Sequence, residues 1–553
     1  MLFLKNYILS KFSFMKKILV SLMAAVLTGV LPATAQENYP TNREVTQRLQ
    51  QLATYKDARL VSLTKTEGGL DIWALQIGRG DLENKPAIAI TGGVEGYHVL
   101  SVELALQIAQ RLLRDHQDLL ETNTFYVFPN MSPDAYSQYH GNLKYERRGN
   151  AAHIDQDRDG EKREDGLEDL NRDGFITEMR IESPLGKYVA HKDYPQVLVE
   201  AEGNTRGEKR YLKYSEGIDN DKDGEFNEDP EEGIAFNKSL TYQFPAFEPY
   251  AGDFPVSQRE TRALLDYLFE RWNIFAFVTF APENNLSAPL KFNKSGAEKR
   301  VLSSMLEKDV ALNKLVSDLY NKTIPQKAYN QDNQGKGGDF FQWAYFHFGR
   351  LSFSTPGWWV PEVKAVEDST QARNGKVTPE TNFIAWAQKE KINDFFINWT
   401  AVEHPDFPNQ KVEVGGIKPF SMTNPPYNMV DSIALNHTNF VVKLAQMKPS
   451  IEFHNLRTEK LSGGLTRITV DIFNNSPLPT HSEIGEKSRW LQKLQITVNK
   501  DKKDILAGNT IKLSEKLGAY EKETVTWLIR GGGTATIKAG APHTGIATIN
   551  VKL

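Results

Sequence analysis

The sequence predicts an α/β body, with a mostly parallel or mixed sheet flanked by helices, followed by an all-β sandwich at the C-terminal end. Residues 87–91 and 124–128 are short apolar runs on either side of a helical pattern, and strand, helix, strand at this spacing is a parallel crossover unit. At 466–472, 494–498 and 523–529, apolar and polar residues alternate instead. That period of two is typical of half-buried strands in a sandwich.

The N-terminus has the pattern of an export signal. Lys16 and Lys17 precede a 14-residue apolar run, Ile18 to Leu31, which is followed by Ala33-Thr34-Ala35. A run of this length is too short to span a bilayer, which needs about 20 residues. We therefore expect residues 1–35 to be a signal peptide, the mature protein to be periplasmic or extracellular, and no membrane anchor to remain after cleavage.

The α/β domain is predicted at residues 36–403. Beyond the crossover unit, further buried strands are predicted at Ile274 to Phe280 and at Leu351 to Ser354. An acidic segment at 151–232 separates these strands from the crossover unit and is too polar to be core. We expect it to be an insertion of loops.

The remaining chain is predicted to hold a linker, one helix and the sandwich. Residues 404–429 contain five prolines and the pair Gly415-Gly416, which favours a linker, and a helical pattern follows before Pro449. We therefore place the linker and helix at 404–449 and the β-sandwich at 450–553.

Composition excludes several kinds of site. The chain has no cysteine, which rules out disulfides, thiolate metal sites and a cysteine nucleophile. Its formal net charge of −4 gives no reason to expect nucleic acid or an anionic membrane as a partner.

Two acidic loops repeat one pattern. Asp155-Gln156-Asp157-Arg158-Asp159-Gly160 and Asp219-Asn220-Asp221-Lys222-Asp223-Gly224 each place three carboxylates at alternate positions before a glycine. Alternation directs oxygen ligands to one centre, as a calcium site requires, although neither loop has the glutamate that ends an EF-hand. Solvated acidic loops are the other interpretation. The candidate calcium ligands are Asp155, Asp157, Asp159, Asp165, Asp169, Asn171, Asp173, Asp219, Asp221, Asp223 and Asp229.

A candidate active site follows the first predicted strand, where Glu95 and His98 lie three residues apart in Thr91-Gly92-Gly93-Val94-Glu95-Gly96-Tyr97-His98. This segment resembles the carboxypeptidase A-like zinc carboxypeptidases, including bacterial members with acidic insertions. In that family a histidine and then a glutamate bind zinc here, a distant histidine is the third ligand, and a separate glutamate acts as base on the metal-bound water. In this chain the first two ligand types are reversed.

The resemblance covers roughly residues 40–400 and assigns substrate contacts. Arg148 matches the arginine that polarises the scissile carbonyl, and Asn237 and Lys238 match the asparagine and arginine that hold the terminal carboxylate. Lysine keeps the charge but lacks the fork of two parallel donors. Tyr329 matches the mobile tyrosine that covers the substrate.

Two further positions depart from the family. Phe280 or Ala281 stands where the third zinc ligand is expected, and Pro356 stands where the general base is expected. Because the reaction needs metal and base together, the sequence favours a catalytically impaired protein that binds peptides or peptide-like wall fragments by their C-terminal carboxylate.

Two alternatives remain open at this point. In the first, Glu95 and His98 still bind zinc, Glu283 supplies a third ligand or a base, and the protein is an active metallocarboxypeptidase with a rearranged site. In the second, the body is a calcium-stiffened surface scaffold. Trp358 and Trp359 could stack on sugars, although aromatic residues in such runs are more often core.

Overall fold

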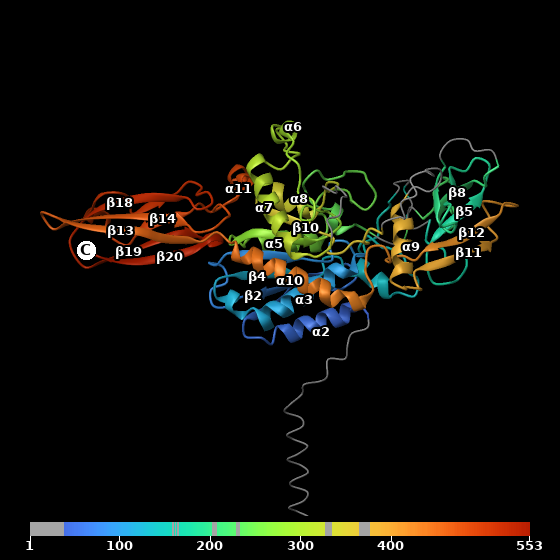
Figure 1. The fold of residues 1–553 in the computed structure, drawn as a ribbon, viewed down its shortest axis with the longest axis horizontal. Coiled ribbons are helices and arrows are strands. Elements are labelled where there is room, and N and C mark those ends of the chain that lie inside the picture. Colours follow the sequence, from blue (N-terminus) through green and yellow to red (C-terminus); the bar gives the residue numbers. More distant parts are fainter. Residues whose placement is uncertain are drawn as a thin grey trace, which may run out of the picture. The chain divides into compact units, whose positions relative to one another are not determined.

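The computed structural model describes residues 38–156, 160, 162, 165–201, 207–227, 230, 233–326, 335–363 and 377–553. Within them, residues from Pro40 onward form one compact unit that contains four sheets (Figure 1). The predicted signal peptide, 1–35, lies outside the described residues. None of the described helices has both the length and the apolar character that crossing a membrane requires.

The first sheet confirms the predicted α/β body. Its six strands follow the order β1-β2-β4-β3-β9-β10, in which β4, β3, β9 and β10 are parallel and β1 and β2 run antiparallel at one side. The central strands are buried along their whole length, as expected of a sheet covered on both faces. Their bounds are β1 Ala58–Lys65, β2 Asp71–Ile77, β3 Ala87–Thr91, β4 Thr124–Phe128, β9 Ile274–Phe280 and β10 Leu351–Thr355.

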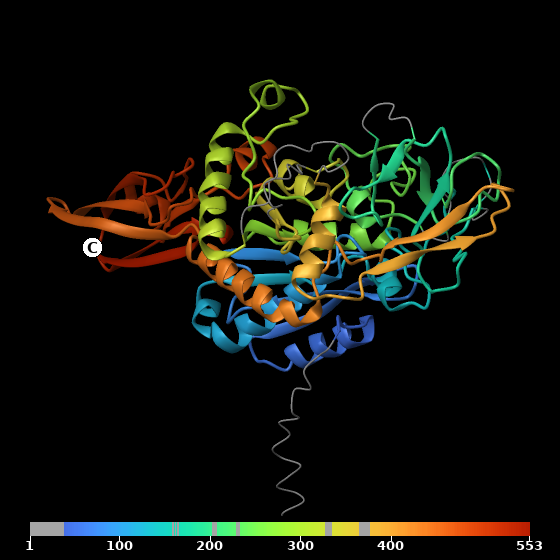
Figure 2. The ribbon, with the colours of Figure 1, turned by 45° about the vertical axis from the view of Figure 1, so that its right-hand side comes forward.

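Helices cover both faces of this sheet (Figures 1 and 2). One face packs against α5 and α8 in a shared apolar cluster, whereas α3 covers the other face, with α10 beside it, where His437 of α10 packs against Phe280 of β9. Residues 430–446 therefore form the helix predicted after the proline-rich segment. The helices are α2 Asn42–Leu52, α3 Val99–Asp115, α4 Pro133–Tyr136, α5 Arg259–Phe269, α6 Lys294–Ala297, α7 Glu307–Thr323, α8 Phe340–Phe346, α9 Pro379–Lys389, α10 Val430–Gln446 and α11 Glu483–Ser488.

A second sheet joins two segments that the sequence analysis treats separately. Its order is β11-β12-β5-β8-β6-β7, so strands of the acidic segment pair with strands of 396–417. The predicted loops and the predicted linker thus share one sheet, with a small core of Met179, Ile181, Val412 and Val414. Neither segment alone has enough apolar residues for its sequence to predict this sheet. The bounds are β5 Glu178–Glu182, β6 Tyr188–Ala190, β7 Leu198–Glu200, β8 Tyr211–Ser215, β11 Phe396–Val402 and β12 Val412–Ile417.

The C-terminal residues form two antiparallel sheets, as the period-two pattern predicts. Their orders are β13-β14-β18-β16 and β17-β15-β19-β20, and the inward residues of both form one core that includes Trp527. The strands are β13 Ile451–Leu461, β14 Leu465–Asn474, β15 Gln495–Val498, β16 Ile505–Ala507, β17 Ile511–Leu513, β18 Lys522–Arg530, β19 Thr534–Ala541 and β20 Gly545–Lys552.

Two buried charged residues of the body bind the segment between β14 and β15. Asp309 of α7 accepts hydrogen bonds from the backbone N–H groups of Glu483 and Ile484, at 2.7 and 2.9 Å. Arg350 donates to the carbonyl of Trp490 at 2.8 Å. Because both side chains are almost fully buried, these bonds form away from water, where a lost partner is costly.

Arg180 of β5 provides a test of the second sheet. Its guanidinium pairs with Glu413 of β12 at 2.8 Å and lies 4.2 Å from the ring centroid of Trp399 in β11. We expect Arg180→Met to lower the free energy of unfolding by about 1–3 kcal/mol and to expose 396–417 to protease. Lys209→Ala is the matched control, since Lys209 pairs with Glu182 on the same sheet but is 67% exposed. Equal stability of the two variants would contradict this role for Arg180.

Candidate functional site

The predicted site residues gather at one edge of the first sheet. Glu95 follows β3, Glu283 follows β9 and Pro356 follows β10. Because these strands are parallel, their carboxyl ends meet at the same edge, which is where ligands bind in open α/β sheets. Asn237 reaches this edge from a short 3₁₀ turn, Phe236–Lys238.

Asn237 connects two of these carboxylates. Its Nδ2 donates to Glu95 Oε1 at 3.0 Å and to Glu283 Oε1 at 3.1 Å, and its Oδ1 accepts from the backbone N–H of Phe340 at 2.9 Å. The side chain is buried and its amide orientation is fixed by these bonds. Glu283, which the sequence suggests as a ligand or base only if the protein is an active enzyme, is thus a hydrogen-bond partner of Asn237.

A third carboxylate, Asp339, joins this cluster and was not predicted from the sequence. It precedes α8 and caps it, accepting from the backbone N–H of Gln342 at 2.7 Å. Burial raises the pKa of Asp339 to about 7. Hydrogen bonds from nearby backbone N–H groups lower this pKa, whereas the charge of Glu95 raises it. The only signal in the sequence was an aspartate directly before an aromatic helical run.

Burial disfavours the charged form of all three carboxyl groups, and neighbouring carboxylates add to this effect at Glu283 and Asp339. Burial raises the pKa of Glu283 well above its ordinary value, and the charges of Asp339 and Glu95 raise it further. Burial also raises the pKa of Glu95, which the amide of Asn237 opposes. Within the described residues, Glu283 Oε2 is buried without a hydrogen-bond partner. A protonated Glu283 therefore has a donor available for a ligand.

Cations surround this acidic cluster. Arg148, Lys238 and Lys336 all lower the pKa of Glu95 through their charge. The Arg148 guanidinium lies 5.9 Å from the ring centroid of Tyr97, and Lys238 Nζ donates to the carbonyl of Pro249 at 3.2 Å. The structure thus brings Arg148, Asn237 and Lys238 to the same site as Glu95. The fourth predicted substrate contact, Tyr329, lies outside the described residues.

The predicted zinc pair is not assembled as a zinc site. No ion pair or hydrogen bond links the side chains of Glu95 and His98 where the chain is described, and no set of three acidic or histidine ligand atoms within 4.8 Å there includes either residue. Zinc needs three such ligands and an open position. The residues described at this site do not fit zinc.

The residues predicted at the other two family positions cannot bind a metal. Phe280 is fully buried and packs edge-on against His437, with ring centroids 5.4 Å apart. Pro356 lines a cavity together with His98. Burial lowers the pKa of His98 to about 4, an effect that the nearby Pro356 carbonyl only partly offsets, so the imidazole is neutral near pH 7.

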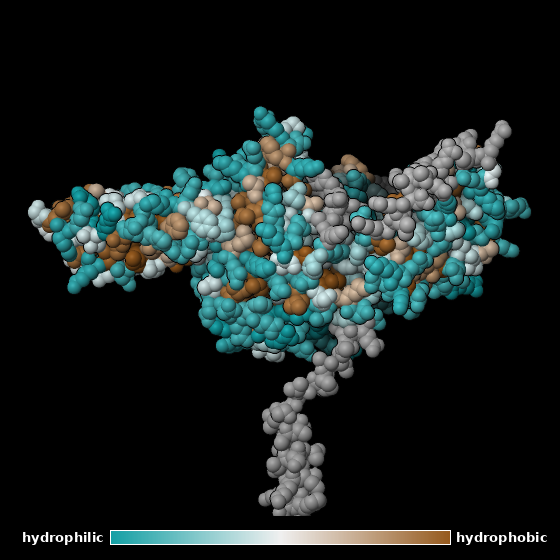
Figure 3. All heavy atoms as spheres, in the orientation of Figure 1, coloured by the Kyte–Doolittle hydropathy of each residue, from teal (hydrophilic) through white to brown (hydrophobic). Residues whose placement is uncertain are grey.

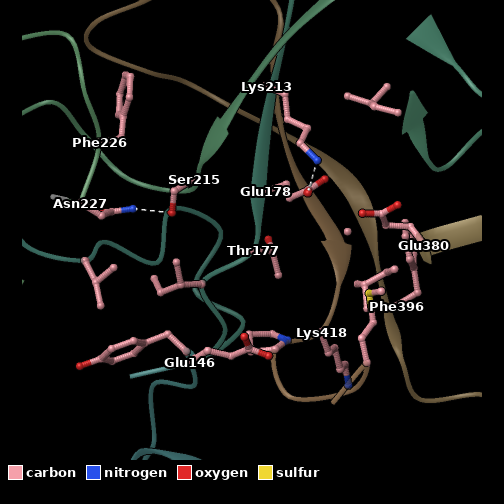
Figure 4. Close-up of a pocket in the computed structure, with 18 of the residues that line it drawn as sticks. Glu146, Thr177, Glu178, Lys213, Ser215, Phe226, Asn227, Glu380, Phe396 and Lys418 are labelled. Carbon is pink, nitrogen blue, oxygen red and sulfur yellow. Dashed lines mark hydrogen bonds and ion pairs between the residues drawn. The ribbon is translucent and has the colours of Figure 1, made fainter. Parts of the chain in front are cut away.

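A cavity of about 520 Å³ opens beside the cationic side of the site, against the second sheet (Figure 4). Figure 4 shows Lys213 paired with Glu178, at 2.5 Å, and Asn227 bonded to Ser215 on one wall, with Glu146 and Lys418 on another. Glu146 and Tyr250 line this cavity and also influence the pKa of Arg148 through their charges. The acidic segment therefore contributes to a recess next to Arg148.

The acidic loops differ in what the structure describes of them. Asp219, Asp221 and Asp223 offer carboxylate oxygens within 4.8 Å of one another. Asp169 of the loop with Asn171 accepts from the backbone N–H groups of Asp173 and Gly174, just as Asp219 accepts from those of Lys222 and Gly224. Asp155 accepts from the backbone N–H of Gly160. Asp165 is fully buried and accepts from the Asn220 side chain at 3.1 Å. Asp157, Asp159 and Asp229 lie outside the described residues.

Comparisons with known proteins match two parts of the chain. A family model described as zinc carboxypeptidase matches residues 45–355, and a model described as a domain of unknown function matches residues 450–552. No curated protein matches the chain.

Solved carboxypeptidase structures are distant neighbours. Thrombin activatable fibrinolysis inhibitor is 12% identical, with a TM-score of 0.39, and the match covers 74% of each chain. Carboxypeptidase A from Helicoverpa armigera is 14% identical, with a TM-score of 0.36, covering 68% of this chain and 78% of that one. A putative carboxypeptidase A from Shewanella denitrificans is 13% identical, with a TM-score of 0.32, covering 56% and 58%.

The buried carboxylate Asp339 predicts a pH dependence of stability. Its pKa is about 7 in the folded protein but near its ordinary value of 3.8 when unfolded, so the folded state binds more protons between these values and loses stability as pH rises through them. Asp339→Asn keeps a capping oxygen and removes the charge. The unfolding free energy of the variant minus that of the parent should increase by about 1–3 kcal/mol as the pH rises from about 5 to 8. A pH-independent difference between the two proteins would contradict this assignment.

Proposed function

This chain belongs to the zinc carboxypeptidase family, and we propose that this member binds the C-terminal carboxylate of a peptide or peptide-like wall fragment without hydrolysing it. The proposal is based on the cluster in which Asn237 bonds to Glu95 and Glu283. Cations that can bind a carboxylate lie near this cluster, whereas the predicted zinc ligands do not converge on one point.

The absence of hydrolysis follows from the parts that the reaction needs. Activation of water by zinc requires a set of metal ligands and a base. Because these residues act as a unit, loss of any one of them removes most of the catalytic rate. Here Phe280 is packed into the core and Pro356 has no titratable group. The chain keeps binding groups without the groups for chemistry.

Binding of a carboxylate is supported by charge and by hydrogen-bond donors. Arg148, Lys238 and Lys336 place three positive charges around Glu95. The raised pKa of Glu283 favours its neutral form, which reduces repulsion of an incoming carboxylate and can donate a hydrogen bond to it. The 520 Å³ cavity beside Arg148 supplies room for the preceding part of the ligand.

The ligand would be met outside the cytoplasm. Residues 1–35 have the pattern of a signal peptide, and wall fragments and secreted peptides occur beyond the inner membrane. Fractionation of cells that express the full chain, with N-terminal sequencing of the product, tests this export directly.

Binding should depend on the free carboxylate and on the two predicted cations. Charge-assisted hydrogen bonds contribute about 1.5–3 kcal/mol, so Arg148→Ala or Lys238→Ala should each weaken binding of an N-acetylated peptide by about tenfold or more. Amidation of the peptide's C-terminus should have a similar effect. Isothermal titration calorimetry measures this, with Lys209→Ala as a control that removes an exposed lysine of the second sheet.

The same preparations test hydrolysis. No release of C-terminal residues is expected with or without added zinc. Zinc-dependent release that is lost in Glu95→Ala or His98→Ala would establish the active alternative instead. Equal binding of the acid and amide forms of the peptide, or no binding of either, would favour the scaffold.

We also propose that the loop of Asp219, Asp221 and Asp223 binds calcium and stiffens the acidic segment. The support is the approach of the three carboxylates to within 4.8 Å, since hard oxygen ligands in such a loop suit calcium. Bound only by the folded state, the ion would stabilise it.

Chelation provides the test of this loop. Removal of divalent ions should lower the melting temperature of the parent, and calcium, but not magnesium at equal concentration, should restore it. Asp219→Asn should be less responsive to calcium, whereas Asp253→Asn, an acidic residue outside the predicted loops, should respond like the parent. An unchanged melting curve with chelator would contradict the proposal.

A further inference from the structure

Lys238, one of the cations that we propose to bind the carboxylate of a ligand, is already paired with a carboxylate of the chain itself. Its Nζ lies 3.5 Å from Oε2 of Glu248 and donates to the carbonyl of Pro249 at 3.2 Å. The side chain of Lys238 is 24% exposed and that of Glu248 is 59% exposed. The pair therefore lies at the surface of the site, where a ligand in solution can reach it.

The turn that presents Glu248, residues 244–250, has an unfavourable backbone. Phe247 and Tyr250 flank Glu248 and Pro249, and their φ angles are 72° and 64°. In this left-handed region the Cβ of a non-glycine residue crowds the following carbonyl oxygen, and bulky residues are rarely found there. Such conformations persist only where surrounding contacts fix them, and they are concentrated at ligand sites and switches.

Buried contacts fix one end of this turn. The backbone N–H of Tyr250 donates to Oε1 of Gln156 at 2.6 Å, and the Tyr250 carbonyl accepts from the N–H of Ala235 at 2.9 Å. Gln156 is 4% exposed, and its amide also donates to the carbonyl of Gly233 at 2.9 Å. Because Gln156 belongs to the first acidic loop, the acidic segment helps to hold the turn against the carboxylate site.

The tip of the turn is held less firmly. The N–H of Ala246 bonds to the carbonyl of Phe244, and that of Glu248 bonds to the carbonyl of Pro245, so both bonds stay within the turn. Phe247 is 77% exposed, although most of the described surface in Figure 3 is hydrophilic. Because this ring buries little apolar area, the tip can move with little loss of packing energy.

We propose that Glu248 is a built-in competitor for Lys238, which it occupies in the free protein and leaves when the C-terminal carboxylate of a peptide binds. The inference rests on the proposed function and identifies the contact that a ligand must break. A glutamate side chain and a peptide C-terminus present the same two acceptor oxygens to an ammonium group. Since an exposed ion pair contributes little stability, a ligand that also bonds to Arg148 can displace Glu248.

Glu248→Gln tests the competition, because glutamine keeps the length of the side chain and removes its charge. By isothermal titration calorimetry, this variant should bind an N-acetylated peptide with a free C-terminus about 1.5- to fivefold more tightly than the parent, the effect of one exposed ion pair. In a Lys238→Ala background the same substitution should have no effect, because the competitor acts only through Lys238. Asp253→Asn should bind like the parent, since Asp253 is exposed near the same turn and forms no ion pair among the described residues.

Hydrogen exchange of the ligand-free protein gives a readout that needs no binding. Exchange of the amides at positions 246 and 248 should be faster in Glu248→Gln than in the parent, because the tip is released.

Several results would overturn the inference. Equal peptide affinity of the parent and Glu248→Gln, an equal gain in Asp253→Asn, or a gain that persists without Lys238 would contradict the competition and leave the carboxylate proposal standing. Unchanged hydrogen exchange would contradict the contact itself. If neither the parent nor Glu248→Gln bound the peptide, the proposed function would fail, and this inference with it.

Discussion

The shared amide of Asn237 is the constraint on which the site depends. It holds the segment after β3, the segment after β9 and the start of α8 together through bonds to Glu95, Glu283 and the Phe340 N–H. All the described hydrogen-bonding capacity of the side chain is directed at these groups. In a zinc carboxypeptidase the first of these segments would face a metal. Here Glu95 bonds to an amide, and this contact supports the proposal that the family's fold is kept without its zinc centre.

The same cluster determines the charges of the site. The charges of Asp339 and Glu95 raise the pKa of Glu283, and the charge of Glu95 also raises that of Asp339. Arg148, Lys238 and Lys336 lower the pKa of Glu95. Such an arrangement suits recognition of a carboxylate beside neutral acids better than activation of water. The second sheet adds the adjacent cavity, so the acidic segment lines a recess as well as carrying the candidate calcium loop.

Local patterns predicted much of the fold and part of the site. The crossover unit, the strands at 274–280 and 351–355 and the sandwich follow from periodicity within single segments. The second sheet could not be predicted, because β5 and β12 are far apart in the sequence and each carries few apolar residues. Motif matching grouped Arg148, Asn237 and Lys238 with Glu95, and the structure places them near that residue. It could not show which way Glu95 and His98 turn, and Asp339 has no motif of its own.

Metal analysis of the mature protein, after saturation with zinc and dialysis, tests the central claim most directly. The account predicts no zinc that depends on Glu95 or His98, so the parent, Glu95→Ala and His98→Ala should retain the same amount. One zinc ion per chain in the parent, lost in both variants, would contradict it and show that a zinc site assembles at this sheet edge.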